Sequence, residues 1–383
     1  MTYPTISHFI ESVTGIYFPL PIQTFGFFIV LAFFVGQIFI KKELVRLEKS
    51  GILNPASNFN KKSILSKWLE FTLNGMFAFF IGYKILPIIN NYKYFSENPQ
   101  DFILSSEGSL FTGILFFIIS IIISLKNYKN NNSSKSQKKI FPSDLSWNFI
   151  FVAAGSGIIG AKLFAVFEDF EYLIKDPLGA LFSFSGLTFY GGLIVGTICV
   201  VIYSRLHKFN ISRIADIFAP SLILSYGVGR LGCHFSGDGD WGIVSNLDSK
   251  PFIFPDWMWS YKFPNNVIEA GVKINDCVGR YCYELPNGVY PTSLYEAIFG
   301  IIAFLILWNL RKKIKVPGIL FCIYLILNGL ERFSIETIRI TKKYNIIGID
   351  LTQAQVIGII LIFIGISSIT ILKNKHKNEP VQK

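Results

Sequence analysis

Charged residues are scarce in this 383-residue chain: Asp, Glu, Lys and Arg together make up 16% of it. The first forty residues contain no Lys or Arg, so the basic segment that opens a cleavable signal peptide is missing, and we expect no such peptide. The sequence has no phosphate-binding glycine loop, zinc motif or Ser-His-Asp arrangement. We therefore expect neither a cofactor nor a metal.

Apolar residues, by contrast, make up half of the chain, and Phe alone contributes 38 of them, well above the usage of soluble domains. Windows long enough to cross about 30 Å of hydrocarbon lie at 22–40, 68–89, 108–125, 147–167, 183–203, 214–235, 291–309, 317–338 and 353–372. The sequence therefore predicts an all-α polytopic membrane protein with about nine transmembrane helices and a small external head domain.

The net charge of +11 comes largely from short loops between these windows, a pattern that indicates membrane orientation and not nucleic-acid binding. The basic loops are 41–67, 126–139, 204–213, 311–315 and the tail 373–383, and they alternate with loops that are acidic or poor in charge. Lys342 and Lys343 are an exception. Because basic loops stay in the cytoplasm, we expect a bacterial inner-membrane protein with its N-terminus outside and its C-terminus in the cytoplasm.

The same pattern divides the chain into six parts. They are the first transmembrane helix and cytoplasmic loop (1–67), an extra helix pair with a cytoplasmic loop (68–146), core helices (147–235), an external head loop (236–290), further core helices (291–372) and a cytoplasmic tail (373–383). The extra pair is predicted from an internal repeat with an offset of 78 residues, in which Gly82, Lys84, Tyr94 and Gly113 match Gly160, Lys162, Tyr172 and Gly191. Duplication explains this spacing better than chance does, and the first copy is expected to be scaffold.

Arg230 is the most unusual residue, because it lies in an apolar run expected to be in the membrane. An arginine keeps its charge, and placing one in lipid costs about 3 kcal/mol or more. Glu331, Arg332, Glu336 and Arg339 interrupt another window, the last three on one helical stripe. With the N-terminus outside, these groups converge beneath the external face. They predict a site for an anion, such as lipid phosphate, unless they form only a packing ion pair or reach to the interface.

Four blocks of sequence surround these residues in a fixed order. They are Tyr190-Gly191-Gly192-Leu-Ile-Val-Gly196, then Gly229-Arg230-Leu-Gly-Cys233-His234 with Asp238, Asp240 and Trp241-Gly242, then Tyr290-Pro-Thr-Ser-Leu-Tyr295-Glu296, and Arg332-x-x-x-Glu336-x-x-Arg339. Together with Gln355 at the start of the last window, they resemble the prolipoprotein diacylglyceryl transferase family. One block alone would be weak evidence, but four in order are specific. The resemblance covers the first window and roughly residues 147–372.

The sequence also departs from the family pattern. Tyr190 stands where the family has histidine, Cys233 where it has asparagine, and Phe25 and Asn328 where it has tyrosines. The acidic stretch contains one residue more than the family pattern, so the glutamate of that pattern corresponds to either Asp238 or Asp240. The nine windows exceed the seven spans usual in the family. These differences are typical of a divergent branch.

The resemblance implies transfer of a diacylglyceryl group from phosphatidylglycerol to the lipobox cysteine thiol of prolipoprotein signal peptides, with release of glycerol phosphate. Its partners are then membrane lipids and signal peptides, with no nucleic acid. We assign catalytic roles to Arg230, Arg332, Glu336, Tyr190, His234 and Asp238, and substrate binding to Gly191, Gly192, Gly229, Cys233, Asp240, Tyr295, Glu296, Arg339 and Gln355. His234 either replaces the missing family histidine as a base or packs against a neighbouring helix. The alternative function is a non-catalytic phospholipid-binding paralogue with the same arginine cavity.

All five cysteines follow residue 198. Cys199, Cys233 and Cys322 lie in apolar windows and are expected to pack as small apolar side chains. Cys277 and Cys282 lie in the external loop, where an oxidising compartment allows a disulfide. Neither a histidine nor a second cysteine pair accompanies them, so they do not indicate a metal site.

Overall fold

The computed structural model describes residues 2–53, 64–97, 99–105, 107–133, 141–176, 188–277, 279–346 and 348–378. Over these residues the chain is mostly helical, and a helix overlaps each of the nine windows predicted from the sequence; the first residues of the 183–203 window lie outside the described ranges. These helices are α2 (Thr24–Lys49), α3 (Ile64–Asn90), α6 (Leu110–Ser133), α7 (Ser146–Glu168), α10 (Phe189–Leu206), α11 (Ile211–Ser236), α13 (Thr292–Leu310), α14 (Ile319–Ile335) and α15 (Gln353–Asn378).

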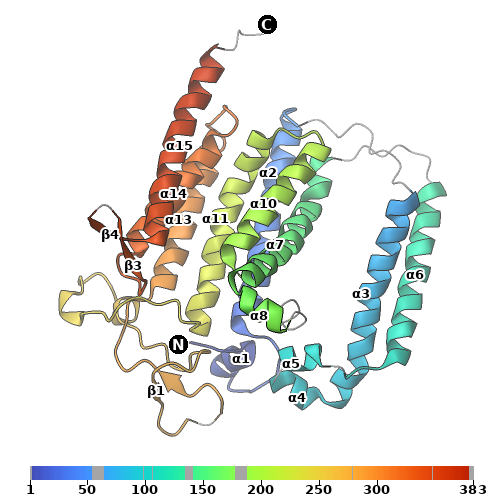
Figure 1. The fold of residues 1–383 in the computed structure, drawn as a ribbon, viewed down its shortest axis with the longest axis horizontal. Helices are drawn as coiled ribbons and strands as arrows, with labels where there is room; N and C mark the ends of the chain where they lie inside the picture. Colours follow the sequence, from blue (N-terminus) through green and yellow to red (C-terminus); the bar gives the residue numbers. More distant parts are fainter. Residues whose placement is uncertain are drawn as a thin grey trace.

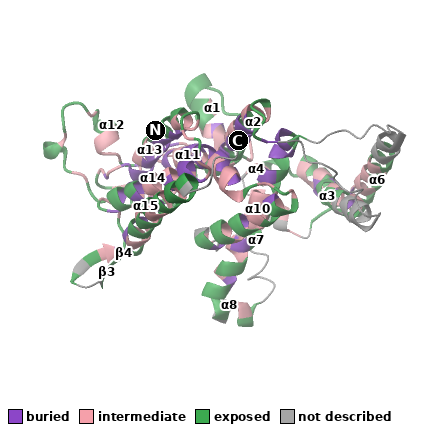
Figure 2. Ribbon diagram, turned by 90° about the horizontal axis from the view of Figure 1, so that it is seen from above, coloured by how far each residue is buried: buried purple, intermediate pink, exposed green. Residues whose placement is uncertain are grey.

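Helix α11 is the centre of the main helix group and packs against α2, α13 and α14, while α15 packs on α14 (Figure 1). Buried residues are concentrated in this group when it is seen from above (Figure 2). One apolar cluster joins α2, α7 and α11 around Leu44, Phe149 and Ile217. A second cluster joins α11, α13 and α14 around Phe304 and Leu320. Burial of these side chains fixes the helices that carry the polar residues of the site.

Two helix hairpins share one plan. In the first, α3 packs on α6, with the short helices α4 (Tyr92–Glu97) and α5 (Pro99–Leu104) between them. In the second, α7 packs on α10. The short helix α8 (Phe170–Lys175) begins 78 residues after the start of α4 and ends 78 residues after the end of α4. Each helix pair also has a glycine of the repeat at its contact. A Cβ added at Gly82 would lie 2.5 Å from the Thr112 carbonyl oxygen, and one added at Gly160 would lie 2.5 Å from the Gly191 carbonyl oxygen. The shared plan supports the internal duplication.

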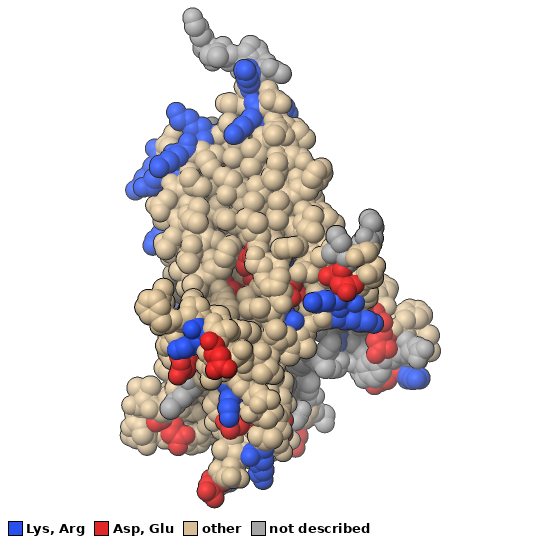
Figure 3. Space-filling model, turned by 90° about the vertical axis from the view of Figure 1, so that its left-hand side faces the viewer, with Lys and Arg blue, Asp and Glu red and all other residues tan. Residues whose placement is uncertain are grey.

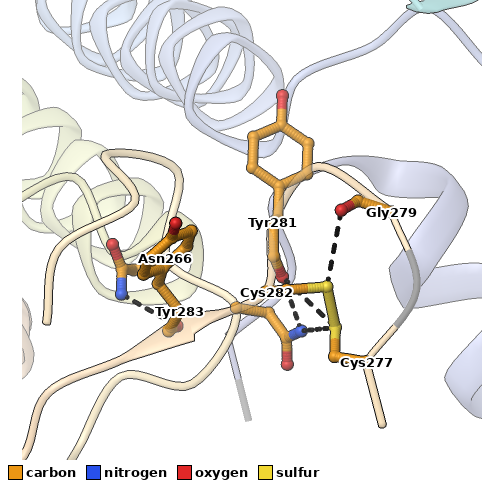
Figure 4. The surroundings of a disulfide bond; sticks show 7 residues. Asn266, Cys277, Gly279, Tyr281, Cys282 and Tyr283 are labelled. Carbon is orange, nitrogen blue, oxygen red and sulfur yellow. Dashed lines mark hydrogen bonds between the residues drawn. A yellow bond between two sulfur atoms is a disulfide. The ribbon is translucent and has the colours of Figure 1, made fainter. Parts of the chain in front are cut away.

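A head segment, residues 237–290, covers one end of the main group (Figure 1). It contains η2 (Leu247–Ser249), α12 (Asp256–Trp259) and an antiparallel pair, β1 (Val272–Lys273) and β2 (Tyr283–Glu284). Cys277 and Cys282 are joined by a disulfide beside this pair (Figure 4). Next to it, the fully buried Asn266 donates a hydrogen bond to the Tyr283 carbonyl oxygen at 3.0 Å and accepts one from the Ala270 N–H at 2.8 Å. Two further short helices are α1 (Ile6–Thr14) and η1 (Pro142–Leu145).

The structure corrects two details of the predicted fold. The chain is mostly helical but not all-α, because β1 and β2 pair in the head and β3 (Lys343–Ile346) pairs with β4 (Ile349–Thr352) before α15. In addition, α14 ends at Ile335, so the predicted helix over 317–338 is too long. The predicted range was chosen by hydrophobicity alone. Its last residues lie beyond the end of α14 and form backbone contacts with the head.

Among the residues that the structure describes, five helices are long and apolar enough to cross a membrane: α2, η1 with α7, α11, α13 and the first 25 residues of α15. The apolar stretches Leu110–Lys126 and Tyr190–Leu206 are shorter. On the face drawn in Figure 3, a broad belt of mostly uncharged residues separates two charged ends. The protein is therefore a polytopic membrane protein.

The contact between α11 and α13 depends on two glycines and generates a prediction about stability. A Cβ added at Gly300 would lie 2.9 Å from the Gly227 Cα and 3.1 Å from the Ile223 carbonyl oxygen. Gly300→Val should therefore separate the two helices and reduce stability by about 1–3 kcal/mol, the range for overpacked sites. Thermal unfolding of the purified protein in detergent measures the loss. Gly155→Val on α7 is the matched control, since no atom lies within 4 Å of the added Cβ there. Equal unfolding temperatures for the two variants would contradict the packing role.

Candidate active site

Helix α11 carries Arg230 close to its C-terminal end. The Asn210 side chain accepts a hydrogen bond from the Arg213 N–H and caps the start of the helix, and Gly237 ends it in the left-handed conformation at φ 65°. Tyr226 lies one turn before Arg230 on the same face, and the guanidinium carbon lies 5.2 Å from the centre of its ring. The helix thus directs an arginine toward the base of the head.

Glu296 is the common partner of three arginines. Its side chain is fully buried in the second turn of α13. Arg230 Nε lies 3.0 Å from Glu296 Oε2, at ion-pair distance but without hydrogen-bond alignment. Arg332 Nη1 and Arg339 Nη1 lie 3.2 Å and 3.4 Å from Glu296 Oε1. We call these four residues and Asp240 the arginine cluster.

Asp240 completes the cluster from the head segment. Its carboxylate contacts the guanidinium groups of Arg230 and Arg339 through different oxygens. The backbone of this turn is held by two hydrogen bonds: the Asp240 N–H donates to Asp238 Oδ1 at 3.3 Å, and Thr292 Oγ1 donates to the Asp240 carbonyl oxygen at 3.0 Å. Of the two acidic residues that the sequence left as alternatives, Asp240 is therefore the one that bridges the arginines.

Arg339 reaches the cluster from outside a helix, which corrects the prediction of a single helical stripe. Arg332 and Glu336 lie at the end of α14, with Arg332 Nη2 3.5 Å from Glu336 Oε1. Arg339 follows the helix and forms a β-bridge with Gly242, next to a hydrogen bond from the Ile243 N–H to the Ile338 carbonyl oxygen. The head and the end of α14 are thus joined through their backbones.

Two further residues belong to the surroundings of the cluster: Tyr226, which the sequence pattern did not single out, and Glu331, which was grouped with Arg332 without being given a role. The Tyr226 hydroxyl donates a hydrogen bond to Glu331 Oε1 at 3.1 Å. Glu336 is buried and accepts a hydrogen bond from the Thr341 hydroxyl at 2.7 Å. Tyr226 could have been identified from its position four residues before Arg230. Glu331 was visible in the sequence as a carboxylate beside Arg332 in an apolar window, and the structure adds its partner, Tyr226.

Cys233 and Asp238 lie beside Arg230. Arg230 Nη1 is 3.8 Å from the Cys233 sulfur, and one ligand atom from each of Cys233, Asp238 and Asp240 lies within 4.8 Å of the others. That spacing suits a cation, but two guanidinium groups already contact Asp240 and repel one. Burial raises the pKa of the Asp238 carboxyl above its usual value. The group therefore fits proton transfer better than metal binding.

His234 lies in an aromatic pocket. Its ring is 5.5 Å from the rings of Phe235 and Tyr261 and 5.6 Å from that of Phe263, measured between ring centres. The side chain is buried. This environment favours the packing role that the sequence left open over the role of a base.

Other residues predicted for the site lie on α10 and α11. Tyr190 is 41% exposed on α10, whose main packing partner is α7. A Cβ added at Gly191 would lie 2.5 Å from the Gly160 carbonyl oxygen, and one added at Gly192 would lie 3.0 Å from the Gly157 carbonyl oxygen. Both Gly191 and Gly192 therefore permit the close contact of α10 with α7. Gly229 is less constrained, since only Ile29 Cδ1 lies near its added Cβ, at 3.9 Å.

Two more of the predicted residues have structural contacts. The Tyr295 hydroxyl donates a hydrogen bond to the Met258 carbonyl oxygen and attaches α13 to the head. Gln355 Oε1 accepts a hydrogen bond from the Thr352 N–H at 3.0 Å, and the Gln355 N–H donates to Thr352 Oγ1 at 3.1 Å. This reciprocal pair is a capping box at the start of α15. The Thr-x-x-Gln spacing before an apolar run was the sequence signal for it.

The chain also matches known proteins. The family model described as prolipoprotein diacylglyceryl transferase matches residues 111–371. A Chlorobaculum tepidum protein named phosphatidylglycerol--prolipoprotein diacylglyceryl transferase is 28% identical over 303 residues, which cover 74% of this chain and 93% of that protein. Proteins of the same name from Clostridium botulinum and Dehalococcoides mccartyi are 32% identical over 285 residues (73% and 99% covered) and 31% identical over 241 (61% and 81% covered).

The matched residues 111–371 contain the whole arginine cluster, whereas α3 precedes them. The family model spans more than half of the chain, and the Clostridium botulinum protein is aligned over almost its entire length. The resemblance of the four sequence blocks and these matches agree. The chain belongs to the prolipoprotein diacylglyceryl transferase family.

Proposed function

We propose that this protein transfers a diacylglyceryl group from phosphatidylglycerol to the lipobox cysteine thiol of prolipoproteins. Family membership and the printed names of the relatives support this reaction. The observation that carries the proposal is the convergence of Arg230, Arg332 and Arg339 on Glu296 and Asp240 beneath the head. Arginine charges held in a partly buried position suit an anionic phosphodiester.

The chemistry of the transfer matches this arrangement of charge. The cysteine sulfur forms a bond to the terminal glycerol carbon of the diacylglyceryl group, and the bond from that carbon to the phosphate oxygen breaks. The electron pair stays on the oxygen, so a phosphodiester becomes a glycerol phosphate monoester with more negative charge. Arg230 and Arg332 stabilise that charge, while Glu296 holds both guanidinium groups in place. One donor placed in this way lowers a barrier by about 3–4 kcal/mol.

The incoming thiol must lose its proton, because the thiolate is the nucleophile. We assign the base to Asp238, which lies outside the membrane helices next to Arg230 and Cys233. Its raised pKa makes it a stronger base than an ordinary aspartate. His234 packs among aromatic rings, and Tyr190 lies on α10, so both are less suitable.

The arrangement of charge also supports an orientation. We propose that the end with the head and the arginine cluster faces outward from a bacterial inner membrane, with the C-terminus in the cytoplasm. On the face drawn in Figure 3, Lys and Arg without acidic neighbours gather near the C-terminal end, while both signs occur at the head end. This distribution follows the positive-inside rule.

One observation favours the alternative, a phospholipid-binding paralogue without transferase activity. The three arginines of the cluster are accompanied by four nearby carboxylates, those of Asp240, Glu296, Glu331 and Glu336. An anion must therefore compete with internal partners. A binder and a transferase would share the arginine cluster and differ in the need for a base.

The role of Arg230 gives the first functional prediction. Arg230→Ala should abolish diacylglyceryl transfer per folded molecule while the protein still inserts into the membrane. Arg230→Lys should restore little activity, since a lysine lacks the planar fork that holds two phosphate oxygens. Transfer from labelled phosphatidylglycerol to a lipobox peptide, divided by protein abundance in the same membranes, measures this effect.

Arg280→Ala is the control for that experiment, because Arg280 is an exposed head arginine paired with Glu269. It should retain normal specific activity. If Arg230→Ala lowered abundance and left specific activity unchanged, Arg230 would be only a packing residue.

The assignment of the base gives a second prediction. Asp238→Asn should lower kcat by about 100-fold or more, the usual contribution of general base catalysis, and should remove the acidic limb of the pH–rate profile. His234→Phe, which keeps an aromatic ring in its pocket, should retain most of the activity. Steady-state kinetics across pH would distinguish the two residues. The reverse pattern would assign the base to His234, and a wild-type protein that binds phosphatidylglycerol without transferring it would favour the paralogue.

The proposed orientation is tested separately with topology reporters. Fusions after residues 130 and 380 should report a cytoplasmic location, and an insertion within 243–285 should report an external one. A cytoplasmic signal from 243–285 would place the arginine cluster at the wrong membrane face and would overturn the orientation.

A further inference from the structure

A second charged cavity lies at the opposite end of α11 from the arginine cluster. It has a volume of about 370 Å³ and lies between the ends of α2, α11 and α13 and the start of α14. Asp216 on its wall is 14 residues before Arg230 on α11, which corresponds to about 21 Å along a helix. The cavity is therefore separate from the proposed active site and lies near the other membrane face.

Basic side chains dominate the lining of this cavity. Five are basic and two are acidic, and the basic ones are Arg46, Arg213, Arg311, Lys312 and Lys315. The excess of three positive charges lines a partly open hollow of the size that small ligands occupy. Such a lining attracts an anion.

The two acidic residues are already engaged. Glu43 pairs with Arg311, with Nε to Oε2 at 2.9 Å, and with Arg46, with Nη2 to Oε1 at 2.5 Å. Asp216 accepts hydrogen bonds from the Gly318 N–H at 2.7 Å and the Phe321 N–H at 2.8 Å, and thus caps the start of α14. One carboxylate is shared by two arginines and the other by backbone donors. Asp216 also attracts Arg213, so two carboxylates are shared among five basic side chains.

Arg311 is fixed in a way that suits a binding residue. Its guanidinium carbon lies 3.3 Å from the centre of the Trp308 ring, and its side chain is 10% exposed. It also donates a hydrogen bond to the Trp308 carbonyl oxygen. A cation held by an aromatic ring and an ion pair loses little conformational entropy when an anion arrives.

The remaining walls of the cavity are apolar and include Leu47, Ile217, Ile314 and Leu320. A small inorganic anion needs only the charges, whereas a lipid also needs apolar surface beside them. Basic pockets between transmembrane helices near a membrane face suit the phosphate of anionic lipid head groups. We propose that this cavity binds a phosphate-bearing anion, with an anionic phospholipid head group as the occupant that its mixed lining fits best.

Lysine footprinting of the complete wild-type protein tests this proposal without altering the site. The protein is placed in bilayers of phosphatidylcholine alone or with added phosphatidylglycerol and is treated with an amine-acetylating reagent. Phosphatidylglycerol should protect Lys312 and Lys315, as measured by mass spectrometry. Lys41 and Lys49 are the internal controls, since they are exposed on α2 and do not line the cavity; they should be modified equally in both bilayers.

Inorganic phosphate added to phosphatidylcholine bilayers distinguishes the two sources of the anion. No protection at millimolar phosphate supports the lipid head group. Selective protection by phosphate alone supports the anion site but overturns the lipid as its occupant. Equal modification of all four lysines under every condition would overturn the site itself.

A charge variant provides the second arm. Arg213→Gln should raise the phosphatidylglycerol concentration needed for half-maximal protection about fivefold, from roughly 1 kcal/mol per basic side chain near an anionic lipid and tenfold per 1.4 kcal/mol. Arg205→Gln is the matched control, since Arg205 ends α10 and does not line the cavity. An equal shift in both variants would indicate only general attraction to the membrane surface and would overturn a specific site.

Discussion

The structure depends most on one buried carboxylate, that of Glu296. It meets guanidinium groups from α11, from the end of α14 and from the segment that follows α14. A buried charge that loses its partners costs about 3–5 kcal/mol, so these elements must remain together. Asp240 extends the constraint to the head by contacting Arg230 and Arg339. The ion pairs therefore hold the helices and the head in register at the place where the proposed reaction occurs.

This arrangement relates stability to function. Arginines that were free in the membrane would be costly, whereas Glu296 and Asp240 hold these arginines in place. In the proposed reaction the phosphate competes with the same carboxylates, and we expect that competition to set its affinity. Tyr190 and Cys233, which depart from the expected family pattern, lie at different distances from the arginine cluster. Cys233 lies beside Arg230, while Tyr190 lies on the α7–α10 hairpin. Divergence at Cys233 is thus the more relevant to the chemistry.

The two ends of α11 have distinct electrostatics. One end carries the arginine cluster, in which three arginines pair with buried or half-buried carboxylates, and the other lines a cavity with an excess of positive charge. The α7–α10 hairpin lies beside this axis, whereas the α3–α6 hairpin stands apart from the main group (Figure 1). Close contacts at glycines allow both hairpins to adopt the same plan.

A polytopic, mostly helical membrane protein and the grouping of Arg230, Glu296, Arg332 and Arg339 in one polar region could be predicted from the sequence. Apolar length and the cost of buried charge are properties of a chain segment, so they can be seen without a fold. Two outcomes became visible only in the folded structure: Asp240 and not Asp238 bridges the arginines, and Arg339 lies beyond the end of α14. Those outcomes depend on how loops return through space to meet helix ends, and neither periodicity nor spacing encodes that.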